Sequence, residues 1–159
     1  MLRAAFDRCA EELGLHLSSG VVVGVSGGSD SMALWALAEE RLGCPVHGLH
    51  VDHGLREGSA AEANWMVEQG SARGWSCAAT RLGGVGADEA SLRAARYAAL
   101  EAARLARGAD WVLLAHHRED QAETVLMRLI TRGGPRGMPK TRGRIARPLL
   151  DVPRAHLRA

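Results

Sequence analysis

The sequence predicts a doubly wound α/β sandwich, a parallel sheet of about five strands with helices on both faces. Short apolar runs, several of them β-branched, recur along the 159-residue chain, which is typical of strands buried on both faces. Longer segments rich in Ala, Leu, Arg and Glu separate them, and strands that alternate with helices form parallel sheets through right-handed crossovers. Aromatic residues make up only 4% of the chain, which favours close-packed helices over an aromatic-rich all-β core.

The beginning of the chain contains a helix, a strand and a second helix. Apolar side chains at helical spacing predict a helix over residues 2–17. Residues 21–25 read Val-Val-Val-Gly-Val, which predicts a buried strand. Gly27 and Gly28 end this run, and a helix is expected over residues 30–42. The stripe of the first helix consists of Leu2, Phe6, Cys9, Leu13 and Leu17.

The middle of the chain continues the alternation. Strands are expected over residues 45–51 and 76–82, and a helix over residues 59–73 lies between them. A Gly-rich loop, 83–86, leads to a helix over residues 89–107, whose composition favours that conformation. The inward face of the helix over residues 59–73 is expected to consist of Ala63, Met66, Val67 and Gly70.

The last third completes the pattern. A fourth strand is expected over residues 111–115 and a helix over residues 119–132. The Gly/Pro/Arg stretch 133–143 is expected to be a mobile loop. A fifth strand is expected over residues 145–150, and Pro153 stands where a further helix would begin.

Charge is balanced over the chain and unbalanced at its end. The 20 Lys and Arg residues against 18 Asp and Glu give a net charge of +2, which does not by itself indicate a nucleic-acid partner. After residue 127, however, Asp151 is the only acidic residue. A polyanionic partner fits such a segment, and so does a solvated basic tail. The basic residues are Arg128, Arg132, Arg136, Lys140, Arg142, Arg144, Arg147, Arg154 and Arg158.

Cysteine usage and hydropathy indicate a cytoplasmic protein. The chain has three cysteines, which is an odd number, and they are widely spaced and form no CxxC pair, as expected of reduced thiols. They are Cys9, Cys44 and Cys77. Charged residues from Asp7 onward argue against a signal peptide, and no apolar run approaches a membrane span. We therefore expect a cytoplasmic chain with no membrane partner.

The segment Ser26-Gly27-Gly28-Ser29-Asp30-Ser31 carries the strongest functional signal. A buried strand ends here and a helix begins, so unpaired N–H groups and the positive end of the helix dipole form a cradle for phosphate. The glycines let a ligand approach the main chain, the serines add hydroxyl donors, and the aspartate suits Mg²⁺ or a helix cap. An ordinary strand–turn–helix with Ser and Asp caps is the structural alternative. The segment matches neither a Walker A loop nor GxGxxG.

This segment matches the SGGxDS signature of the PP-loop ATP pyrophosphatase superfamily. Further co-linear segments resemble the N-terminal catalytic domain of bacterial tRNA(Ile)-lysidine synthetases, and the resemblance runs from about residue 20 to 154. It implies a Rossmann-like fold of the adenine nucleotide alpha hydrolase type. The segments are His50 to Arg56, Leu92 to Leu100, Ala115 to Thr124, and Arg147-Pro148-Leu149-Leu150.

The resemblance implies a reaction and its participants. ATP adenylates the C2 oxygen of the wobble cytidine in an isoleucine tRNA with a CAU anticodon, releasing pyrophosphate. The amine of free lysine then displaces AMP and gives lysidine. ATP and Mg²⁺ are the implied cofactors. By the same resemblance, Ser26, Gly27, Gly28, Ser29, Asp30 and Ser31 hold the phosphates, and His50 and Asp52 lie beside the base or ribose.

The resemblance also assigns the lysine substrate to the segment after the fourth strand. Asp120 and Glu123 lie three residues apart on one helical face, where two carboxylates bind an ammonium group and stage its deprotonation. With Asp30 they form the expected catalytic set. Acids in a first helical turn also complement the helix dipole. The remaining expected substrate contacts are His117, Arg93 and Arg96, and the two arginines also suit a solvated helix face.

Two adjacent histidines, His116 and His117, stand at the end of the fourth expected strand. Neighbouring side chains on a strand point to opposite faces, so at most one of the two is expected to face the site. No Cys or His at ligand spacing accompanies them, which leaves little evidence for zinc.

We expect residues 1–159 to form one PP-loop catalytic domain, truncated at its C-terminal end and without tRNA-binding modules. Glu119 stands where the family has Asp, and the 133–143 loop is short. The alternatives are an ATP-binding fragment without catalysis and another PP-loop enzyme that thiolates or amidates. Thiolating relatives use paired cysteines and amidating relatives use a glutaminase, and the sequence shows neither. The sequence does not determine the oligomeric state, and a homodimer is one arrangement that it allows.

Overall fold

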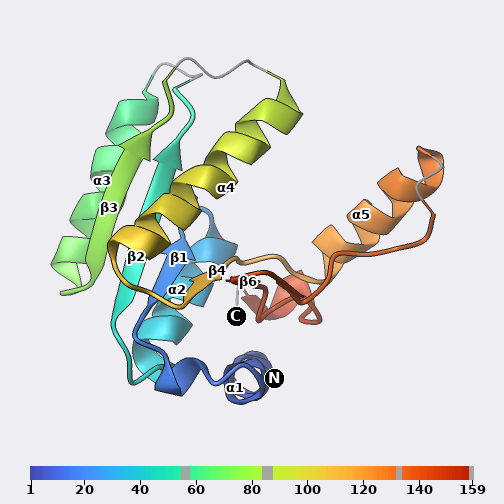
Figure 1. Cartoon of the computed structure of the whole chain (residues 1–159), viewed down its shortest axis with the longest axis horizontal. Coiled ribbons are helices and arrows are strands. Elements are labelled where there is room, and N and C mark those ends of the chain that lie inside the picture. The colour runs from blue at the N-terminus through green and yellow to red at the C-terminus, as the bar shows by residue number, and fades with distance from the viewer. Residues whose placement is uncertain (55–57, 84–87, 132–133, 158–159) are drawn as a thin grey trace.

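The structure is a computed structural model that describes residues 1–54, 58–83, 88–131 and 134–157. Its six-stranded sheet has the order β3-β2-β1-β4-β6-β5 (Figure 1). All neighbouring strands are parallel except β5 and β6, which are antiparallel. The predicted doubly wound class is therefore confirmed, with one antiparallel edge strand added to the expected five. The strands are β1 (Val21–Gly24), β2 (Val46–Asp52), β3 (Ser76–Arg81), β4 (Trp111–Leu113), β5 (Thr141–Arg142) and β6 (Ile145–Ala146).

Helices cover both faces of the sheet. The crossovers from β1 to β2 and from β2 to β3 run through α2 and α3, and α4 returns across the opposite face to β4 (Figure 1). None of the described helices is long and apolar enough to cross a membrane. The helices are α1 (Leu2–Glu12), α2 (Ser29–Arg41), α3 (Ser59–Ala72), α4 (Glu89–Ala106) and α5 (Arg118–Ile130), with short 3₁₀ helices η1 (Leu15–Leu17) and η2 (Arg154–Leu157).

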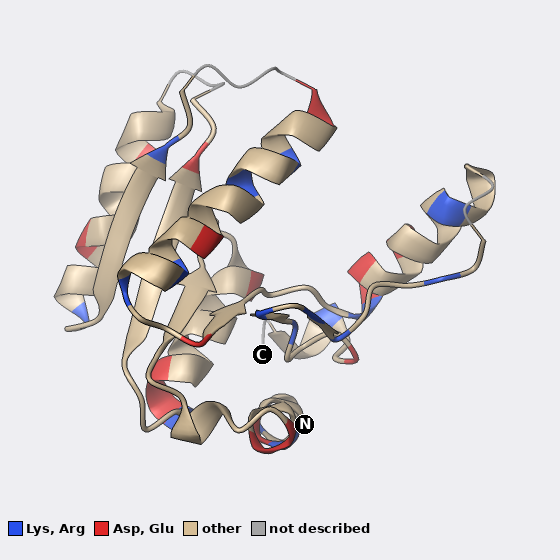
Figure 2. Cartoon of the chain, in the orientation of Figure 1, with Lys and Arg blue, Asp and Glu red and all other residues tan. Residues whose placement is uncertain are grey.

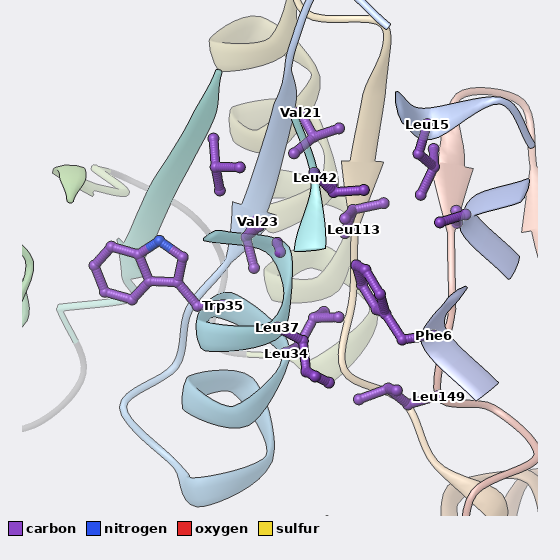
Figure 3. Close-up of a cluster of buried hydrophobic side chains, with 14 of the residues drawn as sticks. Phe6, Leu15, Val21, Val23, Leu34, Trp35, Leu37, Leu42, Leu113 and Leu149 are labelled. Atoms are coloured by element: carbon purple, nitrogen blue, oxygen red, sulfur yellow. The ribbon is translucent and has the colours of Figure 1, made fainter. Parts of the chain in front are cut away.

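The strand β1 separates two hydrophobic cores. Val21 and Val23 pack with Phe6, Leu34 and Trp35 on the face covered by α1 and α2 (Figure 3). Val22 points the other way and packs in a second cluster, together with residues of α4 and β4. Both faces of β1 are thus buried, and this explains why its sequence is continuously apolar rather than alternating. The second cluster consists of Val22, Leu49, Leu100, Ala109, Val112 and Leu114.

The first helix is shorter than predicted. It ends at Glu12 rather than at Leu17, because Gly14 adopts a left-handed conformation with a φ of 61° and breaks the helical path. The three residues of η1 follow this break. As a result, the last member of the predicted apolar stripe, Leu17, is 92% exposed.

The region after α5 also differs from the prediction. The expected fifth strand, 145–150, is limited to the two residues of β6, since Pro148 has no N–H and the chain turns there. The preceding stretch, expected to be a mobile loop, contributes β5. Part of this stretch is tied to α5 by hydrogen bonds from the Gln121 amide to Met138 and from Arg128 to the carbonyl oxygens of Arg136 and Gly137. The described part of the stretch is therefore anchored.

The helix α5 projects from the sheet, and the chain that follows runs back beside it (Figure 1). Basic residues lie along this projection, as Figure 2 shows. Several predicted features lie outside the described residues, namely 84–86 of the Gly-rich loop, Leu55 and Arg56 of the second motif, and Arg132 and Arg158 of the basic segment.

The topology creates a crevice beside β1. The chain leaves β1 toward β2 on one side, while β4 pairs with β1 on the other. The loops that follow β1 and β4 therefore diverge at the carboxyl ends of these strands. In open α/β sheets, ligands bind at such a switch point.

Candidate functional site

Two adjoining cavities lie at this switch point. The larger has a volume of about 490 Å³ and lies between the end of β2 and α4. The smaller, of about 210 Å³, lies between the start of α2 and the loop that joins β4 to α5. Gly24, Ser26 and Arg96 line both cavities. A ligand that contacts these three residues can extend into either cavity.

The loop from Ser26 to Ser31 turns into α2 between the cavities. Gly27 has a φ of 84°, a conformation that L-residues with a side chain rarely adopt. The first helical bond joins the Met32 N–H to the Gly28 carbonyl at 3.1 Å. The N–H groups of the first turn of α2 therefore have no acceptor within the helix. This backbone arrangement is the one that the predicted anion cradle requires.

The serine hydroxyls of the loop partly stabilise the loop itself. The Ser31 hydroxyl donates to the Gly28 carbonyl at 2.9 Å and accepts from the Ser26 N–H at 3.1 Å. The Ser29 hydroxyl donates to Asp30 at 3.2 Å. The hydroxyls of Ser29 and Ser31 are thus engaged within the loop, whereas the first-turn N–H groups provide donors for a ligand.

Asp30 is surrounded by basic groups from distant parts of the chain. Its Oδ2 lies 3.4 Å from His117 Nε2 and 3.3 Å from Arg154 Nε. The helix α2 has no side-chain cap, so Asp30 does not act as a helix cap. Its carboxylate instead joins the start of α2 to the start of α5 and to η2.

His117 is the buried N-cap of α5. Its ring Nδ1 accepts from the main-chain N–H of Asp120 at 3.4 Å, and the main-chain N–H of His117 donates to the Asp120 carboxylate at 2.8 Å, which forms a capping box. The Glu119 carboxylate lies 3.2 Å from Nδ1 of the same ring. The Glu119 carboxylate also accepts from the main-chain N–H of Arg154 at 2.9 Å, and this bond lowers the pKa of Glu119. The acid at position 119 thus connects α5 to η2.

The two predicted lysine-binding carboxylates occupy different environments. Asp120 lines the smaller cavity, next to the loop of α2. Glu123 is exposed one turn further along α5 and lines neither cavity. The two share a helical side, but α5 projects away from the sheet, so only the first turn of α5 lies at the crevice.

Both adjacent histidines line the smaller cavity, and the prediction that at most one faces the site is wrong. The reason is that β4 ends at Leu113, so the alternation of a strand does not extend to His116 and His117. Burial and the neighbouring Arg147 lower the pKa of His116 to about 4. Arg147 itself is 3% exposed, and sequence reasoning gave it no role although it belongs to a recognised motif.

The end of β2 forms one wall of the larger cavity. His50 is buried, and its Nδ1 lies 3.0 Å from the Val25 carbonyl oxygen. Asp52 accepts from the Gly54 N–H at 2.7 Å, and this bond holds the pKa of Asp52 below its ordinary value. His53, which belongs to the same recognised segment as His50 and Asp52, also lines the cavity, and its buried Nδ1 has no hydrogen-bond partner in the described structure.

The two predicted arginines extend from α4 toward the cavities. Arg93 lines the larger cavity and donates to the Tyr97 hydroxyl at 3.2 Å. Arg96 lines both cavities, and burial lowers the pKa of its guanidinium. No carboxylate pairs with Arg96 among the described residues, so its charge is available to an anionic ligand.

Residues 3–159 match the family model of the PP-loop domain, an ATP-binding family. Two curated relatives are named tRNA(Ile)-lysidine synthase. The relative from Thermobifida fusca is 42% identical over 163 residues, an alignment that covers 97% of this chain and 50% of the relative. The relative from Streptomyces coelicolor is 46% identical over 153 residues, with coverage of 89% and 44%.

A solved structure with a similar fold is the U34-tRNA thiolase NcsA from Methanococcus maripaludis. It superposes with a TM-score of 0.76 over 97% of this chain and 61% of that chain, at 18% sequence identity, a level that shows the fold alone. The chain spans half the length, or less, of the two curated relatives described above. The match to the PP-loop model, by contrast, covers nearly every residue. The chain belongs to the PP-loop family.

Proposed function

We propose that this chain is the ATP-binding catalytic domain of a ligase that joins lysine to the wobble cytidine of an isoleucine tRNA. The observation that carries the proposal is the meeting of two cavities at Ser26 and Arg96, beside a loop with free helix N–H groups. One cavity has the size of a nucleotide site, and the other contains carboxylates suited to an amine. The name shared by relatives at 42% and 46% identity supports the reaction.

The larger cavity suits the adenosine of ATP. Its volume of about 490 Å³ lies in the usual range of small-molecule sites. His50 and Asp52 line the wall where base or ribose would lie, and Arg93 lies on the opposite wall. The phosphates would then reach the loop after β1, where the N–H groups of α2 and Arg96 neutralise their charge.

Mg²⁺ fits the residues that face the smaller cavity. Asp30 and Asp120 both line it, and Mg²⁺ is commonly bound by one or two carboxylates together with substrate phosphates. No group of three or more metal-binding side chains occurs among the described residues, so phosphate oxygens would have to complete the coordination. Bound there, Mg²⁺ would supply charge neutralisation for the pyrophosphate leaving group.

The smaller cavity suits the second half of the reaction. In the first step the C2 oxygen of the cytidine attacks the α-phosphorus, the bond to the bridging oxygen breaks, and pyrophosphate leaves. In the second step the lysine amine attacks C2 and AMP leaves. Asp120, which lines this cavity, would bind the ammonium group and accept the proton that the amine must lose, and Glu123 would be a second carboxylate outside the cavity, exposed one turn further along α5. Basic residues on α5 and the chain beside it suit the tRNA backbone (Figure 2).

The experiment measures pyrophosphate release by the purified chain with ATP, Mg²⁺, lysine and a transcript of isoleucine tRNA carrying CAU. We expect release that requires the tRNA and a nucleoside product with the mass of lysidine. A transcript with a CAU-to-GAU change is the matched control. ATP binding without pyrophosphate release favours an ATP-binding fragment, and release supported by ammonia or a sulfur donor instead of lysine favours an amidating or thiolating enzyme.

A further inference from the structure

A buried arginine holds His116 against the smaller cavity. Arg147 Nε donates to His116 Nδ1 at 3.2 Å. The same guanidinium donates to the Pro139 carbonyl oxygen at 2.9 Å and to the Tyr97 hydroxyl at 3.4 Å. Contacts in three directions, to the loop after β4, to α4 and to the chain before β5, fix the orientation of Arg147.

This contact determines the tautomer of the imidazole. An arginine side chain only donates hydrogen bonds, so Nδ1 of His116 must accept and carries no proton. Burial and the adjacent guanidinium keep the pKa of His116 near 4, so the ring is neutral at physiological pH. The single ring proton therefore resides on Nε2.

The ring of His116 lines the smaller cavity, and its Nε2 atom is accessible. His116 lines this cavity together with Ser26, Ser31 and Arg96. In the part of the chain that the structure describes, the only hydrogen bond of this ring is the one from Arg147 to Nδ1. Among the described residues, the only fully buried side-chain nitrogen or oxygen atom without a hydrogen-bond partner is His53 Nδ1. Since His116 Nε2 also has no partner, it is not fully buried. A neutral donor and the Arg96 cation thus face the same space.

We propose that His116 is a nucleotide-contacting residue whose Nε2–H donates to a phosphate oxygen of ATP beside Arg96, and that Arg147 is the positioning residue that fixes this donor. The inference rests on the proposed function only in taking ATP as the ligand of the loop at residues 26–31. A neutral donor binds phosphate without first taking up a proton. The donor is therefore present throughout the range from about pH 6 to 8.

The first test compares ATP affinity, by calorimetry, for the His116→Gln, His116→Asn and His116→Ala variants. The amide nitrogen of glutamine reaches the place of Nε2, whereas that of asparagine reaches only the place of Nδ1. We expect ATP to bind about tenfold more weakly to the Asn and Ala variants, the range for a hydrogen bond to a charged group, and near wild-type affinity for the Gln variant. Replacement of the exposed His16 by Ala is the matched control.

The second test is a ¹⁵N NMR spectrum of the histidine rings of the intact chain, with His116 assigned by the signals lost in His116→Gln. We expect protonated Nε2 and unprotonated Nδ1 from pH 6 to 8, and a shift of the Nε2 signal when ATP is added. A proton on Nδ1, an unshifted ring, or equal ATP affinity of the wild type and the Asn and Ala variants would overturn the assignment. Absence of ATP binding by the wild type would overturn the proposed function as well, so the two failures are distinguishable.

Discussion

Arg154 and Asp30 form an ion pair, with Nε 3.3 Å from Oδ2, although 124 positions separate them in the sequence. The pair brings the end of the described chain onto the first turn of α2. Arg154 also donates its main-chain N–H to Glu119 at 2.9 Å. Its side chain is 49% exposed, so the guanidinium can leave Asp30 without uncovering the core.

This geometry predicts that Arg154 and Mg²⁺ compete for Asp30. In Arg154→Ala the main-chain bond to Glu119 remains while the competing cation is lost. We expect the free energy of unfolding to change by no more than about 1 kcal/mol, because a half-exposed ion pair contributes little. The affinity for ATP without Mg²⁺ should fall, because Asp30 then has no arginine beside it and repels the phosphates. The increase in ATP affinity on adding Mg²⁺ should be larger than in the wild type, and calorimetry measures both affinities. An unchanged ratio of the two affinities would contradict the competition, and Arg144→Ala, outside the smaller cavity, is the control.

A second prediction separates the two glycines of the loop. A side chain at Gly27 is strained because its φ is 84°, whereas a Cβ at Gly28 would meet only the Ser26 hydroxyl, at 3.6 Å. We expect Gly27→Ala to lower the free energy of unfolding by about 1–2 kcal/mol. We expect Gly28→Ala to keep wild-type stability and to lose ATP affinity, because the added methyl group enters the space of the phosphate. The two quantities are measured by urea unfolding and calorimetry. Wild-type ATP affinity in Gly28→Ala would show that no phosphate approaches this glycine.

A third prediction concerns the pH dependence of stability. The Gly54 N–H holds the folded pKa of Asp52 below its ordinary value of 3.8, so the ionised form stabilises the folded state above that value. This contribution is lost as pH falls from about 5 through the lowered folded pKa. Asp52→Asn, which keeps the shape, should therefore be less stable than the wild type at pH 7 and approach it in acid. Urea unfolding at several pH values measures the difference, and a gap that stays constant with pH would exclude this origin.

The sequence predicts β1 well because Val21, Val22 and Val23 are buried on both faces, and a continuous apolar run is the direct signature of that environment. It predicts the strand–turn–helix at residues 21–42 because strand, glycines and helix start are adjacent in the chain. It does not predict β5, since a strand of two residues carries no periodicity, and it predicts β6 only as part of a longer strand over residues 145–150. Nor does it predict the pairing of Asp30 with Arg154 or of His116 with Arg147. These contacts form because the strand order places β1 next to β4 and β4 next to β6, so that segments far apart in the sequence meet at the switch point.

The last prediction tests the packing beneath the crevice. Gly48 lies in β2 directly over Trp35, and a Cβ there would come within 2.8 Å of the indole ring. The ring is fully buried and contacts Trp75 at a centroid distance of 5.1 Å, so it has little room to move. We expect Gly48→Ala to lower the free energy of unfolding by about 1–3 kcal/mol, the usual cost of overpacking. Gly43→Ala, with nothing within 4 Å of the added carbon, should stay within about 0.5 kcal/mol of the wild type. Equal stability of the two variants in urea unfolding would mean that α2 can move away from β2. In that case the packing of Trp35 on Gly48 would not fix the position of the loop at residues 26–31.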